Sequence, residues 1–384
     1  MKFFEDNMAQ VNKRNHPVCG DYCICDRTTA DTIYVLADGV GSGVYANISA
    51  IFCANRLVEL YRSGVSQREA AELVAESMHR ARQEDMPFVA FSMAKILPDG
   101  QFTVYSYEAP QPIAVLDGRA QPLQQRFYTS YYETVAETVG TLQMGDSLVL
   151  CSDGVTQAGL GHGYGFGIGT EGLANFINRK LMRGQNLTRF CHTVIEMTRS
   201  ISGGVYEDDT TIAMLQCREA NELTIFSGPP ADRKRDAEFA RRFRTEPGRC
   251  IICGSTTADV ISRELKREIK MVNMDLSYGS PPEYKMEGAT MVTEGAMVLN
   301  QLLNLLDEDP RNFVEKTPVE RLCLYIHEAD VITFVIGDAV NDAHTNMMFK
   351  QVGVRPRHTV IDLIAENLRK KGKLVVMESW KGGR

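Results

Sequence analysis

The spacing of apolar and polar residues predicts two regions of different architecture. Before residue 218, short apolar runs that read as strands are separated by polar or glycine-rich turns. Apolar residues recur at helical spacing from Val44 to Val58, which predicts a core-packed helix over residues 43–61. The other elements expected in this region are helices at 67–83, 172–182 and 187–202, and strands at 88–97, 101–107, 113–116, 147–152 and 210–217. Antiparallel strands flanked by helices predict a layered α+β domain.

The order of the predicted elements changes in the last third of the chain, where strands and helices alternate. The expected strands are 250–253, 331–336 and 374–377, and the expected helices are 257–268, 293–306, 318–327 and 360–371. This alternation predicts a smaller α/β domain with a mainly parallel sheet. The Ser-Gly-Pro-Pro segment at 227–230 reads as a break, and the charged stretch 232–244 reads as a solvated connecting helix. We therefore expect domains at 1–218 and 249–384, joined by a linker at 219–248, with a regulatory or ligand-binding role for the second domain.

Composition narrows the class of protein. The chain has 384 residues, of which 44% are hydrophobic and 24% are charged, as in ordinary soluble globular proteins. Its formal net charge of −7 gives no sign of a basic surface that would bind nucleic acid, and it disfavours binding to anionic membranes. The N-terminus lacks the apolar core of a signal peptide, and no apolar run approaches the ~20 residues that cross a bilayer. A cytoplasmic protein is the expectation.

The ten cysteines are expected to be reduced, because most of them lie inside apolar runs. Cys250 and Cys253 have the spacing of half a zinc site. The segment between them reads as a strand, however, so their side chains are expected on opposite faces. No second Cys-x-x-Cys pair occurs in the sequence. We therefore predict neither a disulfide nor a structural metal there.

The most informative residues are acids at the ends of strand-like runs. One run ends in Ala-Asp38-Gly, another ends in Ser-Asp153-Gly, and a third follows the adjacent acids Asp208 and Asp209. Strand ends can meet at one edge of a sheet, and clustered carboxylates repel one another unless a cation neutralises them. Oxygen-only ligands suit Mg²⁺ or Mn²⁺. The sequence therefore predicts an acidic metal centre built from separated strand ends.

These acids occur within four short segments that follow one another along the chain. The segments are Cys-Gly-Asp at 19–21, Ala-Asp-Gly-Val-Gly-Ser-Gly at 37–43, Gly-Asp-Ser with Ser-Asp-Gly-Val-Thr at 145–156, and Asp-Asp-Thr-Thr at 208–211. From about residue 15 to 218 the chain resembles the metal-dependent type 2C (PPM) protein phosphatases. It is most similar to the bacterial branch typified by the stage II sporulation phosphatase E. The resemblance implies a four-layer α-β-β-α sandwich with two central antiparallel sheets.

The resemblance also implies two Mn²⁺ or Mg²⁺ ions at one edge of the sandwich. The residues it assigns to the metals are Asp21, Asp38, Gly39, Asp153, Asp208 and Asp209. Asp38 would bridge both ions, Gly39 would offer its backbone carbonyl, and Asp21 would bind directly or through water. The arginine that holds phosphate in animal enzymes has no counterpart at the right spacing, since Arg14 does not match.

The remaining three acids complete the implied site. Asp153 and Asp208 would complete one metal site, and Asp209 is an alternative to Asp208, because the sequence does not fix which of two adjacent acids points inward. Asp21, Asp38, Asp153 and Asp208 form the expected catalytic set. The implied activity is hydrolysis of phosphoserine and phosphothreonine in proteins by a water activated between two metals. The implied substrate is a small phosphorylated antagonist protein of a bacterial partner-switching circuit. The glycine-rich segment 157–172 is expected to form a substrate flap.

Two other interpretations remain open at this point. In the first, a phosphatase-like scaffold serves a sensor whose second domain binds a ligand. Gly254, Ser255, Thr256 and Thr257 would then form either an anion site or an ordinary helix cap. In the second, the segment 334–342 resembles the metal-binding motif of haloacid dehalogenase-type phosphatases. Their opening motif would fall at 151–156, where Cys151 replaces the nucleophilic aspartate.

Overall fold

The computed structural model describes residues 1–84, 86–183, 189–272, 281–313, 317–339 and 353–380. It divides the chain into two compact units, Met1–Glu219 and Ala220–Arg384, which are considered separately below. Within the described residues, no helix combines the length and the apolar character needed to cross a membrane.

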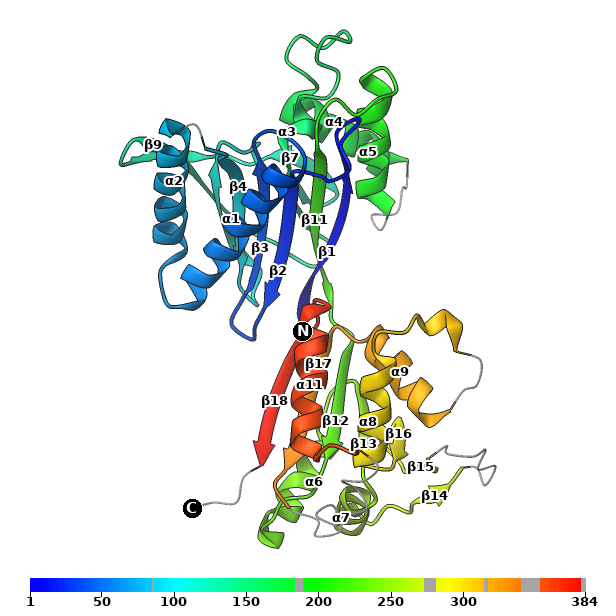
Figure 1. Ribbon diagram of the computed structural model, residues 1–384. Helices are drawn as coiled ribbons and strands as arrows, with labels where there is room; N and C mark the ends of the chain where they lie inside the picture. Colours follow the sequence, from blue (N-terminus) through cyan, green and yellow to red (C-terminus); the bar gives the residue numbers. More distant parts are fainter. Residues whose placement is uncertain (85, 184–188, 273–280, 314–316, 340–352, 381–384) are drawn as a thin grey trace. The chain divides into compact units, whose positions relative to one another are not determined.

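The first unit contains two antiparallel sheets (Figure 1). In order across the sheet, the five-stranded sheet consists of β1 (Lys2–Val11), β11 (Thr210–Glu219), β10 (Ser147–Cys151), β6 (Ile113–Leu116) and β7 (Arg119–Pro122). The six-stranded sheet consists of β2 (Asp21–Arg27), β3 (Thr32–Gly39), β4 (Val89–Ile96), β5 (Gln101–Tyr107), β9 (Glu133–Thr141) and β8 (Arg126–Ser130). The predicted antiparallel strands are thus present, together with β1, β2 and β7–β9, which the apolar pattern did not reveal.

Helices cover the outer face of each sheet. Helices α1 (Val44–Arg62) and α2 (Gln67–Gln83) share one apolar core with the six-stranded sheet. Helices α4 (Gly169–Met182) and α5 (Phe190–Ile201) share another core with the five-stranded sheet. A third core, which includes Phe4, Leu36 and Leu148, joins the two sheets. These layers confirm the predicted α-β-β-α sandwich.

Strand β3 shows how the sequence specifies these layers. Its odd-numbered residues from Ile33 to Ala37 pack in the core beneath α1 and α2, whereas Tyr34 and Leu36 pack between the sheets. All five side chains are buried. A strand buried on both faces needs a continuous apolar run, and that is the pattern that precedes Asp38.

The second unit is built on one seven-stranded sheet. Its strands, in order, are β14 (Lys270–Met271), β15 (Glu283–Lys285), β16 (Met291–Thr293), β13 (Arg249–Cys253), β12 (Glu222–Ser227), β17 (Val331–Gly337) and β18 (Leu374–Trp380). The pairings from β16 to β18 are parallel. Helices α6 (Asp236–Arg244) and α7 (Ser255–Leu265) share a core with one face. Helices α8 (Ala296–Leu305), α9 (Pro318–Glu328) and α11 (Arg357–Lys370) share a core with the other. The prediction of a mainly parallel sheet is confirmed.

The predicted linker at 219–248 is wrong. Strand β12 lies inside the sheet and pairs with both β13 and β17. Helix α6 is not a solvated connector either, because Phe239 and Phe243 are 0% and 2% exposed within the core on that face. The second unit therefore begins at Ala220 rather than at residue 249, and the segment 227–230 is a strand-end loop inside it.

The cysteines are all unpaired in the structure. Cys250 and Cys253 are both buried, and they lie in the cores on opposite faces of the second unit's sheet. This arrangement follows from the alternation of side chains along a strand. It leaves the two thiols unable to bind one metal ion.

Candidate metal centre

Asp21 and Asp38 face each other at one edge of the six-stranded sheet. Asp21 is the first residue of β2, and the antiparallel register pairs it directly with Asp38, the penultimate residue of β3. The Asp21 side chain is 1% exposed. Neither of its carboxylate oxygens has a hydrogen-bond partner within the described part of the chain. A buried carboxylate left without donors is costly in its charged form, and either a proton or a cation would reduce that cost.

The five-stranded sheet brings further acids to one of its edges. Asp153 begins the short helix α3 (Asp153–Thr156), two residues after β10 ends. Asp208 and Asp209 directly precede β11, which is the antiparallel neighbour of β10. At Gly154, an added Cβ would lie 2.1 Å from the backbone oxygen of Asp209. Glycine at this position therefore allows α3 to approach the two acids closely.

The two adjacent acids have different surroundings. Asp209 is 4% exposed, and its Oδ1 accepts a hydrogen bond from the backbone N–H of Lys13 at 2.8 Å, while its Oδ2 is buried without a partner among the described residues. The Asp208 side chain is 38% exposed and lies 3.4 Å from Nζ of Lys13. Asp209 thus lies on the buried side of the cluster and Asp208 on the open side. The choice between them as a metal ligand stays a prediction.

The charges of these acids interact. Burial and the neighbouring carboxylates of Asp21 and Asp153 raise the pKa of Asp38 to about 9. Burial, with a smaller effect of Asp209, raises the pKa of Asp21 to about 6. The pKa of Asp153 is also raised, by burial and by Asp208. Asp38 therefore interacts with acids from both sheets, as a bridging ligand would.

The donor set fits a hard divalent cation. It consists of carboxylate oxygens, two of them on Asp21 without a hydrogen-bond donor in the described part of the chain, and the backbone carbonyl of Gly39. In the part of the chain that the structure describes, no three acids converge to coordinating distance.

Glycines shape the approach of α1 to the site. A Cβ at Gly39 would lie 2.2 Å from the backbone oxygen of Ala46, so only glycine lets the first turn of α1 pack against the end of β3. Gly43 precedes this helix with φ of 79°, and no side chain caps the helix N-terminus. The glycine-rich sequence after Asp38 is thus required by the turn from strand to helix.

Sequence reasoning missed Lys13, a basic residue beside the acids, and His16, which lies beside the loop that follows Asp38. Lys13 contacts Asp208 and Asp209 as described above, and Nε2 of His16 lies 3.3 Å from Oγ of Ser42. Both belong to the connection between β1 and β2. The sequence of this connection shows neither a regular spacing of apolar residues nor a recognisable motif. The pairing of β1 with β11 and of β2 with β3 brings this connection to the site. The backbone N–H of Arg14, which was given no role, donates to the carbonyl of Tyr206.

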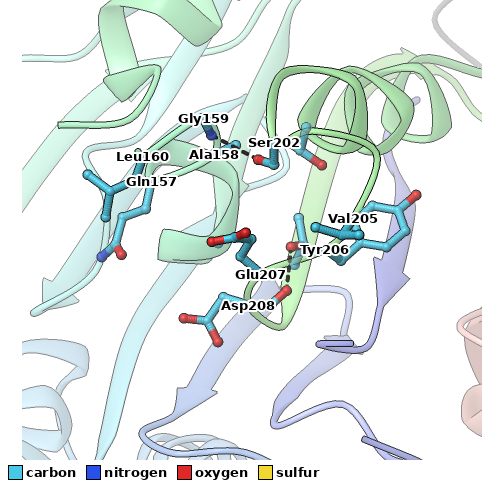
Figure 2. A pocket seen from close by; sticks show the side chains of 12 residues that line it. Gln157, Ala158, Gly159, Leu160, Ser202, Val205, Tyr206, Glu207 and Asp208 are labelled. Carbon is cyan, nitrogen blue, oxygen red and sulfur yellow. Dashed lines mark hydrogen bonds between the residues drawn. The ribbon is translucent and has the colours of Figure 1, made fainter. Parts of the chain in front are cut away.

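A pocket of about 190 Å³ lies beside Asp208 (Figure 2). Its wall is formed by Gly154, Gln157, Ala158, Gly159, Leu160, Thr198, Ser202, Val205, Tyr206, Glu207, Asp208 and Thr210. The N–H of Gly159 donates to Oγ of Ser202, and Nε2 of Gln157 donates to Oδ2 of Asp153. The glycine-rich segment is therefore connected to both α5 and the acid cluster. Its movement as a flap stays a prediction.

The candidate ligand-binding residues at 254–257 lie in the second unit. Gly254 precedes α7 with φ of 128°, and Oγ1 of Thr257 accepts a hydrogen bond from the N–H of Gly228. Thr257 is thus engaged in holding a strand-end loop. The haloacid dehalogenase-like motifs do not share a unit, since Cys151 belongs to β10 of the first unit and Phe334 to β17 of the second. Residues 340–342 of that motif lie outside the described residues.

Comparisons with known proteins find a family model and solved structures that are similar to part of the chain. Residues 28–218 match the family model of stage II sporulation protein E (SpoIIE). No curated protein matches the chain. The chain is similar to a solved structure of the PP2C phosphatase domain and a regulatory-domain fragment of SpoIIE from Bacillus subtilis, with 17% identity and a TM-score of 0.48 over 56% of this chain and 64% of that one. It therefore spans less than two thirds of that relative.

Two further structures are similar to this chain. The RsbU and RsbW domains of a Mycobacterium tuberculosis protein align with 18% identity and a TM-score of 0.46, over 62% of this chain and 68% of that one. RsbX in complex with magnesium aligns with 22% identity and a TM-score of 0.41, over 56% of this chain and 100% of that one. The family match assigns residues 28–218 to the stage II sporulation protein E family.

Proposed function

We propose that the first unit hydrolyses phosphoserine and phosphothreonine in proteins with the help of two Mn²⁺ or Mg²⁺ ions. The observation that supports this most strongly is the pairing of Asp21 with Asp38 at the sheet edge, together with the interaction of Asp38 with Asp153. A fold without a cation to bind has no physical reason to keep these carboxylates together.

Each acid has a distinct part in this proposal. Asp38, which interacts with acids on both sides, would contact both ions, with the carbonyl of Gly39 beside it. Asp153 and Asp208 would hold one ion on the open side of the cluster, and Asp21 would complete the buried side. When bound, divalent cations supply Lewis acidity, which polarises the phosphoryl group and lowers the pKa of water.

The thiol nearest in sequence to Asp153 is unsuited to act as a nucleophile. Cys151 is buried in β10, and burial, with smaller effects of the nearby aspartates, raises the pKa of its thiol to about 12. A thiol with this pKa remains protonated at neutral pH and does not attack phosphorus. This supports a reaction in which water is the nucleophile.

A protein substrate fits the surface beside the acids. Leu160 and Tyr164 are 48% and 43% exposed, and Phe166, on the same glycine-rich segment, is 96% exposed. Exposed apolar side chains next to a reaction site favour contact with a protein surface over a small phosphoester. We therefore propose a phosphorylated protein as substrate, namely a small antagonist protein of a bacterial partner-switching circuit.

Hydrolysis of phosphopeptides tests the proposed activity. Phosphate release from phosphoserine and phosphothreonine peptides is measured with the full-length protein in Mn²⁺, in Mg²⁺ and in excess chelator, with a phosphotyrosine peptide as the specificity control. We expect release with either metal and none with chelator, because the acids alone supply no electrophile. A cooperatively folded protein that releases no phosphate with either metal would instead support the scaffold-and-sensor interpretation.

A further inference from the structure

The parallel strands of the second unit have the order of a doubly wound sheet. From β12 the chain adds β13 and then β16 on one side, and it returns to add β17 and β18 on the other side. Helices α6 and α7 lie in the core on one face, and α8, α9 and α11 lie in the core on the other. The strand order therefore reverses between β12 and β17. In such sheets, ligands bind outside the carboxyl ends of the strands at this reversal.

An arginine occupies this position. Arg357 is the first residue of α11, and its Nη2 donates to the carbonyls of Gly337 at 2.8 Å and Ala339 at 2.9 Å, just after β17. Its guanidinium also covers Gly228, just after β12, since a Cβ there would lie 2.2 Å from Nη1. The arginine thus contacts the ends of both strands that flank the reversal.

The positive charge of Arg357 is only partly balanced by the residues that the structure describes. Within the described residues it forms no ion pair with a carboxylate, and its Nε is buried without a partner. Burial lowers the pKa of the guanidinium, although Asp338 acts in the opposite direction. The first turn of α11 contains no acid to offset the positive end of the helix dipole. An anion at this point would relieve all three costs.

Ser227 provides an independent sign of a missing partner. It is the last residue of β12, its side chain is 0% exposed, and its Oγ has no hydrogen-bond partner among the described residues. Leu223 and Ile225 pack in the core that includes α11, so the alternation of the strand directs Ser227 to the same face. On that face, at the end of β12, a buried hydroxyl and the buried Nε of Arg357 both lack partners in the described part of the chain.

We propose that the switch-point edge, defined as Ser227, Gly228, Gly337 and Arg357, binds the phosphate group of a soluble phosphorylated small molecule. A planar guanidinium and the free amides of a helix N-terminus are both suited to a phosphate. Gly228 and Gly337 keep side chains away from the strand ends, where the N–H of Gly337 donates to the carbonyl of Gly228. This site lies in the second unit and does not depend on the activity proposed for the first.

Thermal unfolding of the full-length Asp38→Asn protein in excess chelator isolates this site from the metal centre. The probes are inorganic phosphate, pyrophosphate and ADP, with sodium sulfate at equal ionic strength as the control. We expect a saturable rise of the melting temperature of about 3 °C or more with at least one phosphate compound. A response to inorganic phosphate or pyrophosphate alone identifies a free phosphate ligand, and a stronger response to ADP identifies a nucleotide.

Further substitutions in the Asp38→Asn protein show whether the rise in melting temperature comes from the switch-point edge. Arg357→Gln should weaken binding at least about tenfold, whereas Arg355→Gln, which removes the same charge from an exposed side chain two residues earlier, should not. Ser227→Ala should weaken binding without lowering the melting temperature of the ligand-free protein, because its hydroxyl has no partner among the residues that the structure describes. This variant decides the question if Arg357→Gln fails to fold.

Three results would overturn the proposal. One is the absence of a saturable response to any phosphate compound, and another is an equal response to sulfate. The third is an undiminished phosphate response in folded Arg357→Gln or, if that variant does not fold, in Ser227→Ala. Arg357 would then serve only to join the ends of β12 and β17.

Discussion

Replacement of Asp38 by asparagine is expected to reduce metal-dependent phosphopeptide hydrolysis by about a thousandfold or more. Asp38 interacts with both Asp21 and Asp153, which come from different sheets. The substitution therefore removes the negative charge that lies between these two acids. Divalent cations contribute several kcal/mol of charge stabilisation in the transition state, and about 4 kcal/mol corresponds to a thousandfold in rate. Asparagine keeps the shape of the side chain, so the fold should be retained.

The measurement compares initial rates of phosphate release at saturating Mn²⁺, with melting temperatures to verify folding. Asp99→Asn is the matched control, because Asp99 is an exposed acid outside the cluster. Asp153→Asn should behave like Asp38→Asn. If folded Asp38→Asn protein retained more than about a tenth of the wild-type rate, a loss below ~1.4 kcal/mol, the assignment of Asp38 to the metals would be wrong.

A fragment of residues 249–384 is expected not to fold, whereas a fragment of residues 220–384 is expected to fold alone. The shorter fragment lacks β12, which pairs with β13 on one side and β17 on the other. Leu223, Ile225 and Phe226 are almost fully buried. At about 2 kcal/mol for each side chain, their loss removes ~6 kcal/mol, which approaches the whole stability of a typical domain.

Circular dichroism during heating distinguishes the two fragments. The longer one should show a cooperative transition, and the shorter one should show none. Cooperative unfolding of the 249–384 fragment would contradict the central place of β12 in the sheet. The result does not depend on the phosphatase site, since every acid of the cluster lies before residue 220.

The positions of the acids in the first unit could be predicted because they follow local rules. A strand buried on both faces is a continuous apolar run, and Asp38 ends one such run in β3. Asp153 follows another run, in β10. Strand β2 was harder to recognise, because a charged residue at each end and two cysteines interrupt its apolar pattern. Its Tyr22 and Ile24 nevertheless pack on one face and Cys23 and Cys25 on the other.

The domain border could not be placed from local signals. A Ser-Gly-Pro-Pro segment after a strand occurs between domains and also at the end of a strand within an α/β sheet. Strand β12 is short, and only its long-range pairing with β17 shows that it is central. In α6, the many charged residues obscured Phe239 and Phe243, whose spacing of four places them on one buried face.

Calorimetric titration of the metal-free, full-length protein with Mn²⁺ tests the central claim most directly. We expect two Mn²⁺ ions per chain at about pH 8, and loss of tight binding in Asp38→Asn. Binding should weaken between about pH 8 and about pH 5.5, because the raised pKa values of Asp38 (about 9) and Asp21 (about 6) mean that Mn²⁺ must displace protons. A folded wild-type protein that binds no Mn²⁺, or binding that is unchanged in Asp38→Asn, would contradict a metal centre at this edge.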